Sequence, residues 1–273
     1  MRGFLLISVL VSVIVVLTLI YVIPSQTPFS AFSGSPLGLS LAERFFSTSD
    51  KVVVIVQPHH EVTQLVNMYL HENYTIVLVG NNNVINETLK EFGAYLGPYS
   101  VKDPVFNAGN SSEVEVFYDG QVGILYDSYP IYNVSPMVET SGFSYAGHQR
   151  GPFTVVGEIR LKGGATVIVI SSPYVMTNYF IRDNLNFLYA VVGKSAYIYP
   201  NPESPLDYVK LALDSLPNYS LLALVLSLLI LPIKVKDENI RKNKDEIIKR
   251  VLSLHPDWDE TVLRRIYDDR NKE

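Results

Sequence analysis

The chain has 273 residues, of which 48% are hydrophobic and 18% charged, and its formal net charge is −5. This length suits one sizeable domain with additional segments, and the acidic balance argues against nucleic-acid binding, which needs a basic surface to neutralise phosphates. The absence of cysteine excludes disulfides, thiolate metal sites and a cysteine nucleophile.

The first element is an uncharged run of 20 residues from Phe4 to Ile23. A helix needs about 20 apolar residues to cross a hydrocarbon core of roughly 30 Å, so we predict a transmembrane helix at 4–23. A cleaved signal peptide is the alternative, but its apolar region would be only about 7 to 15 residues long. Residues 1–3 would stay in the cytoplasm, and residues 24–50 would form a linker and a first helix.

Strands and helices then alternate. Continuous runs rich in β-branched residues at 51–57 and 74–80 are typical of strands buried on both faces of a sheet. Helical spacing of apolar residues follows each run, at 59–72 and 86–96. This order favours parallel strands with right-handed crossovers in an open, mostly parallel sheet of an α/β fold.

The middle of the chain, 105–156, departs from this order and is predicted to form an antiparallel insertion. Its strongest feature is a hairpin over 113–127 with Asp119 and Gly120 at the turn. The α/β pattern then resumes and continues towards the end of the domain. We expect strands at 157–161, 165–171 and 196–199, a tight turn at 162–164, and helices at 178–192 and 205–216.

A second apolar segment, 218–235, is shorter than a standard span, but basic residues follow it at once. They are Lys234, Lys236, Arg241, Lys242, Lys244, Lys249 and Arg250. We therefore predict a second transmembrane helix, with a buried core helix as the alternative. The expected protein crosses the plasma membrane twice, with both termini cytoplasmic, residues 51–217 as an extracytoplasmic α/β domain, and the lipid bilayer as a partner.

The tail, 236–273, is predicted to be cytoplasmic and helical. A helix at about 245–253 ends at His255 and Pro256, and a second helix with an acidic first turn follows. Two short amphipathic helices bury little surface alone, so we expect them to dock on a cytoplasmic protein or on lipid headgroups. An independently solvated helical pair is the alternative.

Acceptor motifs for N-linked glycans lie in the stretch assigned outside the cytoplasm. The three predicted glycosylation sites are Asn73, Asn86 and Asn110. Two further motifs are weaker, because Pro136 follows the motif of Asn133 and because Asn218 adjoins the second apolar segment.

Ligands of open α/β sheets bind at the carboxyl ends of the strands, where three polar loops should meet. The candidate ligand-binding residues there are His59, His60, Glu61, Asn81, Asn82, Ser171 and Ser172. In one interpretation His60, Glu61 and His148 bind a metal, or act as acid and base for Ser172 as nucleophile. In the other, which we favour, His and Asn cap the helices that follow. No HExxH, GxSxG or phosphate-loop pattern is present, so no catalytic residue, metal or cofactor is predicted.

The segment KGGATVIVISSPYVMTNYFIRDNLNFLYAVVG, residues 162–193, resembles glutamine-amidotransferase-like domains that have lost their chemistry. The matching positions are Gly163, Gly164, Ser171, Ser172, Asn178, Asp183 and Asn184. The whole chain is similar to an uncharacterised family of membrane-anchored proteins whose genes often lie beside a MoxR-type AAA+ ATPase. The resemblance implies a flavodoxin-like, class I glutamine-amidotransferase-like fold and such an ATPase system as a partner, but no reaction, because the nucleophilic cysteine is absent.

Asp183 and Asn184 are either solvent-facing helix residues or, as we favour, the source of a structural bond to a neighbouring loop. The leading functional hypothesis is a non-enzymatic membrane protein, a component of a membrane complex, with an extracytoplasmic binding domain and a cytoplasmic tail. The alternative is an extracytoplasmic hydrolase that uses the strand-end His, Glu and Ser residues.

Overall fold

The structure is a computed structural model. It describes residues 12, 23, 25–49, 51–161, 163–215, 248–249, 252–253 and 259–262. Residues 23–212 form one folded unit, and residues 1–22 with 213–273 are assigned to a second. The first unit contains every strand among the described residues.

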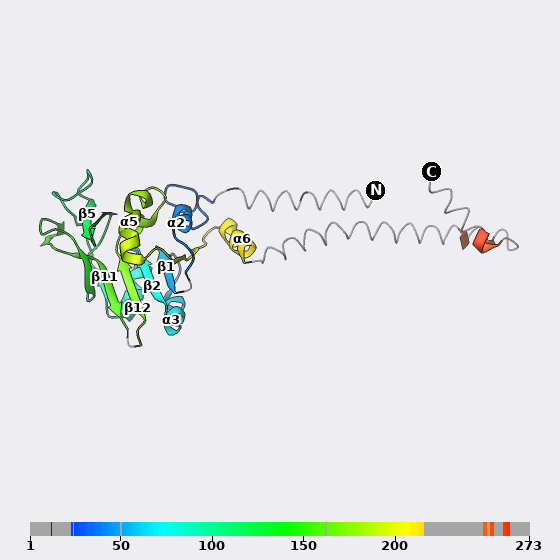
Figure 1. Ribbon diagram of the computed structural model, residues 1–273, viewed down its shortest axis with the longest axis horizontal. Coiled ribbons are helices and arrows are strands. Elements are labelled where there is room, and N and C mark those ends of the chain that lie inside the picture. The colour runs from blue at the N-terminus through cyan, green and yellow to red at the C-terminus, as the bar shows by residue number, and fades with distance from the viewer. Residues whose placement is uncertain are drawn as a thin grey trace. The chain divides into compact units, whose positions relative to one another are not determined.

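A six-stranded mixed sheet forms the centre of this unit, with the strand order β13-β1-β2-β12-β11-β8. The strands are β1 (Val52–Val56), β2 (Thr75–Val79), β8 (Ser135–Glu139), β11 (Thr154–Arg160), β12 (Thr166–Ile170) and β13 (Tyr197–Ile198). The first four in the strand order run parallel, whereas β11 is antiparallel to both β12 and β8. Figure 1 shows β1, β2, β12 and β11 side by side.

The predicted open, mostly parallel, flavodoxin-like sheet flanked by two transmembrane helices is therefore wrong, and the fold is a mixed α/β one. The physical reason lies in the turn after β11, where Gly163 and Gly164 have φ of 114° and 96°. So short a connection can only join antiparallel neighbours, because a parallel pair needs a crossover of a dozen residues or more. β12 is thus parallel to β2 on one side and antiparallel to β11 on the other.

Alternate strand residues point to opposite faces of the sheet, and helices cover both. Val53 and Ile55 pack with α3 (Thr63–His71) and α4 (Asn83–Glu91). Val54 lies on the other face, in a cluster with α2 (Ser40–Phe45) and α5 (Ile181–Val192). A 3-10 turn, η1 (Pro173–Met176), leads into α5, and α6 (Pro205–Asp214) ends this part of the described chain.

The remaining strands form three small antiparallel sheets, β10-β9-β4, β3-β7 and β5-β6. They are β3 (Tyr95–Leu96), β4 (Val101–Lys102), β5 (Glu113–Tyr118), β6 (Gln121–Tyr126), β7 (Ile131–Tyr132), β9 (Tyr145–Ala146) and β10 (Gln149–Arg150). The predicted hairpin is confirmed as β5 and β6. Asp119 and Gly120, with φ of 48° and 71°, form its two-residue turn, as the twist of a hairpin favours.

Three helices begin at other residues than predicted. α3 begins at Thr63 rather than 59. α4 begins at Asn83 rather than 86, because the side chain of Asn82 accepts a hydrogen bond from the N–H of Ile85 and fixes the start three residues earlier. α5 begins at Ile181 rather than 178, because the preceding residues form η1 and a turn.

The two predicted transmembrane segments, 4–23 and 218–235, lie outside the described residues except for Ser12 and Ile23. Among the residues that the structure does describe, no helix is long and apolar enough to cross a membrane. The longest, α5, has 12 residues and spans about 18 Å, short of the roughly 30 Å required. On this finding the two-pass plasma-membrane topology, with its extracytoplasmic domain, is corrected and not retained.

The predicted tail, 236–273, also lies mostly outside the described residues. The described positions 248–249, 252–253 and 260–262 are helical, and the break at 255–256 is not among them. Docking of the tail stays a prediction.

Candidate functional site

The carboxyl ends of β1 and β2 meet in a network of side-chain amides. Gln57 Oε1 accepts from the backbone N–H of Asn81 at 3.0 Å, and Gln57 Nε2 donates to Asn81 Oδ1 at 3.2 Å. Asn81 Nδ2 in turn donates to the carbonyl of Asp127 at 2.9 Å and to its carboxylate at 3.0 Å. This network ties the end of the hairpin β5–β6 to the central sheet.

The neighbouring Asn82 caps α4 and also donates from Nδ2 to the carbonyl of Pro58 at 2.6 Å. Both the oxygen and the nitrogen of its side-chain amide are therefore hydrogen-bonded. The capping interpretation of this asparagine is confirmed.

Ser171 and Ser172 are fully buried at the end of β12, and backbone groups occupy their hydroxyls. Ser171 Oγ donates to the carbonyl of Val155 and accepts from the N–H of Tyr129. Ser172 Oγ donates to the carbonyl of Tyr126 at 2.6 Å. A nucleophilic serine needs a base as its hydrogen-bond acceptor. Here the acceptors are peptide carbonyls, so both hydroxyls hold the hairpin β5–β6 and β11 in place.

The histidines do not gather around these serines. His59 Nε2 forms an ion pair with Glu203 Oε1 at 2.6 Å, and His59, His60 and Glu61 are all exposed. His148 lies in the turn between β9 and β10, in another part of the domain. Among the described residues, no group of three His, Asp or Glu side chains is arranged to hold a metal ion.

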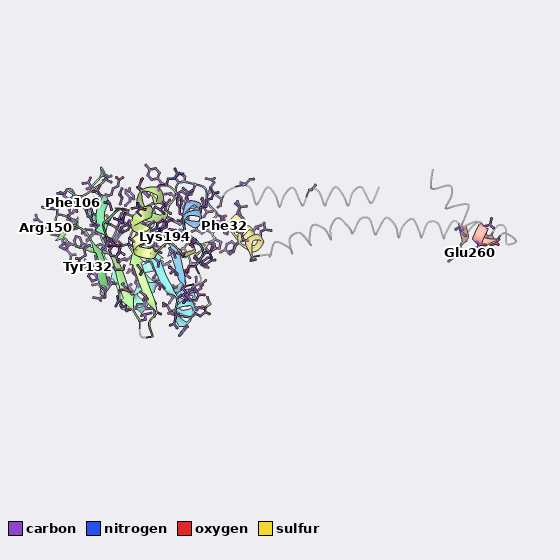
Figure 2. The ribbon with its side chains drawn as sticks, viewed as in Figure 1. Phe32, Phe106, Tyr132, Arg150, Lys194 and Glu260 are labelled. Atoms are coloured by element: carbon purple, nitrogen blue, oxygen red, sulfur yellow. The ribbon has the colours of Figure 1, made fainter. Side chains whose placement is uncertain are left out.

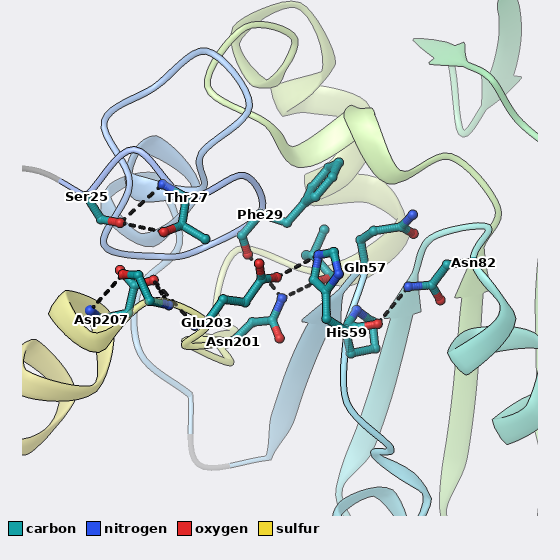
Figure 3. Close-up of polar contacts among 12 residues, drawn as sticks. Ser25, Thr27, Phe29, Gln57, His59, Asn82, Asn201, Glu203 and Asp207 are labelled. Carbon is teal, nitrogen blue, oxygen red and sulfur yellow. Dashed lines mark hydrogen bonds and ion pairs between the residues drawn. The ribbon is translucent and has the colours of Figure 1, made fainter.

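Glu203 follows β13, the fourth parallel strand, and sequence reasoning missed it. Burial raises the pKa of Glu203, and Asp207 adds to this rise, while His59 and His60 oppose it. Asp207 is buried one helical turn later, where its carboxylate accepts from the N–H of Ser204 at 3.1 Å. Figure 3 shows these residues beside Asn201.

Residues 25–46 belong to the same folded unit, although they were predicted as a linker and a first helix. Asn201 Nδ2 donates to the carbonyls of Phe29 and Val56, so it links this segment to β1 (Figure 3). Asn178 donates to the carbonyls of Ser33 and Ser35. The segment is therefore held to β1 by the buried amide of Asn201 and to the turn before α5 by the half-buried amide of Asn178.

Asn184 makes a structural bond, as predicted, but its partner is strand β6 rather than a loop. It is fully buried, its Oδ1 accepts from the N–H of Ile124 at 2.7 Å, and its Nδ2 donates to the carbonyl of the same residue at 3.1 Å. Asp183, in contrast, is exposed.

Of the predicted glycosylation sites, Asn73 and Asn110 are exposed and Asn86 is half-buried, with Oδ1 accepting from the N–H of Leu96. Nothing in these contacts tests glycosylation, which stays a prediction.

Burial raises the pKa of Asp127, and the hydrogen bond from Asn81 only partly opposes this. A folded-state pKa above the unfolded one means that the ionised carboxylate costs stability at neutral pH. This cost disappears as the pH falls through the folded-state pKa and below the unfolded one. Asp127 also has a left-handed φ of 50°, which asparagine tolerates well.

We therefore expect Asp127→Asn to raise the urea midpoint of unfolding at pH 7, because Asn keeps an acceptor for Asn81 without the buried charge. The gain should shrink as the pH is lowered below about 4. Asp119→Asn is the matched control, since Asp119 is exposed and has a similar φ of 48°. A gain at Asp127 that does not depend on pH would contradict the electrostatic explanation.

Two adjoining hollows lie over the small antiparallel sheets, away from the strand ends. The first has a volume of about 460 Å³ and the second about 440 Å³, and they share His148 and Gln149. The first is also lined by Tyr95, Pro98, Tyr99, Pro130, Tyr132 and Ala146. The second is also lined by Pro104, Gly142, Phe143, Tyr145, Gly147 and Arg150. We call the two together the tyrosine groove.

Strand pairing positions the walls of the tyrosine groove. Tyr95 and Tyr132 are directly opposite in β3 and β7, and their rings stack at 5.1 Å. The hydroxyl of Tyr132 donates to Gln149 Oε1 at 3.0 Å and so joins this pair to β10. Figure 2 shows Tyr132 and Arg150 at the end of the domain that Phe106 also occupies, opposite Phe32. Only His148 in this groove was a sequence candidate; the high tyrosine content was the other available signal.

No protein-family model matches the chain, and no curated protein matches it. Among solved structures, a chain described as the mmIFT52 N-terminal domain is similar over 52% of this chain and 78% of its own, with 13% identity and a TM-score of 0.39. A likeness this distant carries no argument about function. The resemblance to amidotransferase-like proteins stays a prediction.

Proposed function

We propose that residues 23–212 form a non-enzymatic binding domain and that the tyrosine groove is its binding surface. One observation carries this proposal: the hydroxyls of Ser171 and Ser172 and the amides of Asn81 and Asn82 at the strand ends are hydrogen-bonded within the fold, while the open concave surface lies over the small antiparallel sheets. Binding sites are concave and lined by aromatic side chains with a few polar groups, which describes the tyrosine groove.

The aromatic surface around the groove favours a protein as the ligand. Phe143, at the second hollow, is 64% exposed, and its ring stacks on Phe106 at 6.5 Å. Phe106 in turn meets Phe117, which is 58% exposed, edge to face. Adjacent exposed aromatic rings are typical of protein interfaces. The groove and this aromatic rim together offer a continuous surface to a partner. An AAA+ ATPase system stays a candidate partner.

Site-specific photo-crosslinking in the native host tests the proposal. A benzophenone side chain placed at Phe143 is expected to trap one partner protein, and the same group at Tyr208, which is 50% exposed on α6, is the control. The adduct at 143 should disappear when Tyr99→Ala removes part of the groove wall. An identical set of adducts at both positions, or an adduct that survives Tyr99→Ala, would contradict binding at the groove.

The hydrolase alternative makes a different prediction. We expect a fluorophosphonate probe, which labels activated serines, to leave the folded protein unlabelled, because Ser172 is fully buried and its hydroxyl donates to a carbonyl. Intact-mass analysis after incubation measures this directly. Stoichiometric labelling that is lost in Ser172→Ala would favour the hydrolase.

A further inference from the structure

Resting on the proposed function, we propose that the tyrosine groove binds an extended, proline-rich segment of a partner in the polyproline II conformation, with an acidic residue of that segment paired to Arg150. Three features of the tyrosine groove support this ligand: the flat rings that form its first hollow, the polar atoms that line it, and the charge of its second hollow.

The platform of the first hollow is built from flat rings. Tyr95 and Tyr132 stack side by side, and Pro98 and Pro130 lie beside them. A polyproline II helix repeats every three residues and displays rigid pyrrolidine rings with no internal hydrogen bonds. Aromatic grooves recognise such segments because the ligand is already ordered and loses little entropy on binding. Tyr and Pro walls of this kind provide that surface.

Several polar side chains of the groove can donate hydrogen bonds to a ligand. The Oε1 of Gln149 already accepts from the hydroxyl of Tyr132, which leaves the amide nitrogen of this exposed residue as a donor for a ligand. The hydroxyl of Tyr99 and the guanidinium of Arg150 add further donors, and both residues are exposed. A proline segment offers carbonyl acceptors and lacks N–H groups, so it matches donors. An oligosaccharide is the competing ligand. Its hydroxyls donate as well as accept, so they also require acceptors in the groove.

The platform is held in place before a ligand arrives. Gly147, in the turn between β9 and β10, has a left-handed φ of 58°, and the ring of Tyr99 packs where its side chain would be. A Cβ at this position would lie 2.6 Å from that ring. Any larger residue would displace Tyr99, so Gly147 fixes the position of one wall of the groove.

The charge of the second hollow selects the acidic residue. Arg150 is exposed, and none of the described residues that line the hollow carries a carboxylate. No ion pair involves Arg150 in the part of the chain that the structure describes. Since His148 and Gln149 belong to both hollows, one extended ligand can reach from the tyrosine platform to this guanidinium. A carboxylate there would form a charge-assisted, bidentate pair.

Fluorescence anisotropy of labelled peptides with the full chain tests the inference. The probes are an oligoproline of about eight residues ending in two aspartates, the same peptide ending in two lysines, and a Gly-Ser peptide ending in two aspartates. We expect saturable binding of the first peptide, binding roughly tenfold weaker for the lysine peptide, and none for the Gly-Ser peptide.

Variants then separate the two parts of the groove. Tyr99→Ala should weaken the aspartate peptide by about tenfold or more, whereas Arg150→Gln should remove the preference for aspartate over lysine and leave the proline contribution intact. Tyr208→Ala, on α6 outside the groove, should change neither affinity.

Equal affinity for the proline and Gly-Ser peptides, or no saturable binding, would overturn the inference. So would saturable binding of a chito- or malto-oligosaccharide that Tyr99→Ala abolishes, in place of the peptide. Crosslinking at Phe143 that persists with a proline-free partner would overturn the ligand class while leaving the proposed function standing.

Discussion

Replacing Asn184 by leucine is expected to lower the free energy of unfolding by about 3 kcal/mol, because the fully buried carboxamide is lost and the N–H and carbonyl of the half-buried Ile124 are left without partners. The side chain also donates to the carbonyl of Phe180, the N-cap of α5, but this carbonyl keeps the backbone N–H of Asn184 as a donor in the variant. Urea unfolding followed by circular dichroism measures the loss.

The matched control for this substitution lies two residues along the same helix. Asn186 is exposed, so Asn186→Leu changes the same atoms without removing a buried hydrogen bond. We expect its effect to stay within about 0.5 kcal/mol. Because leucine favours helices more than asparagine does, helix propensity cannot cause a loss. Equal destabilisation by both variants would therefore show that the bonds to Ile124 are not its cause.

Phe187→Ala is expected to cost about 3 to 5 kcal/mol, the range for removing a fully buried phenylalanine. The ring of Phe187 lies against Gly123 of β6, where a Cβ would approach ring carbons to 2.6–2.8 Å. Gly123→Ala alone should therefore destabilise by about 1 to 3 kcal/mol through overpacking. In the Phe187→Ala background the same change should cost little, because the added methyl group enters the space that the ring has left.

Gly142→Ala is the control for this pair, because its Cβ would meet no atom of the described residues within 4 Å. Its effect should be close to zero in both backgrounds. Additive effects of the Phe187 and Gly123 substitutions would contradict the close contact between α5 and β6.

The sequence predicted the elements of the fold better than their arrangement. The β-branched runs identified β1, β2 and β12, and the Asp119-Gly120 pair identified the hairpin β5–β6, because both signals are local. The mostly parallel sheet was wrong, since a strand run does not reveal the direction of the neighbour it pairs with. The glycine turn at 163–164 held that information, as so short a connection requires an antiparallel neighbour.

The candidate site was harder to predict for a related reason. The strand-end residues were placed correctly at one edge of the sheet, but which of them are occupied by hydrogen bonds depends on β5 and β6, whose docking no local pattern encodes. The tyrosine groove is built from two-residue strands, and its stacked rings, Tyr95 and Tyr132, are far apart in the sequence. Apolar periodicity cannot be detected in elements so short.

The bond from Asn184 to β6 also has a consequence for self-association. A hairpin leaves unpaired N–H and carbonyl groups along its outer strand, and such a border can recruit a strand from another molecule. The carboxamide of Asn184 satisfies one residue of that border, Ile124, in the way a neighbouring strand would. A side chain from a helix thereby imitates one step of a β-ladder and blocks intermolecular pairing at this residue.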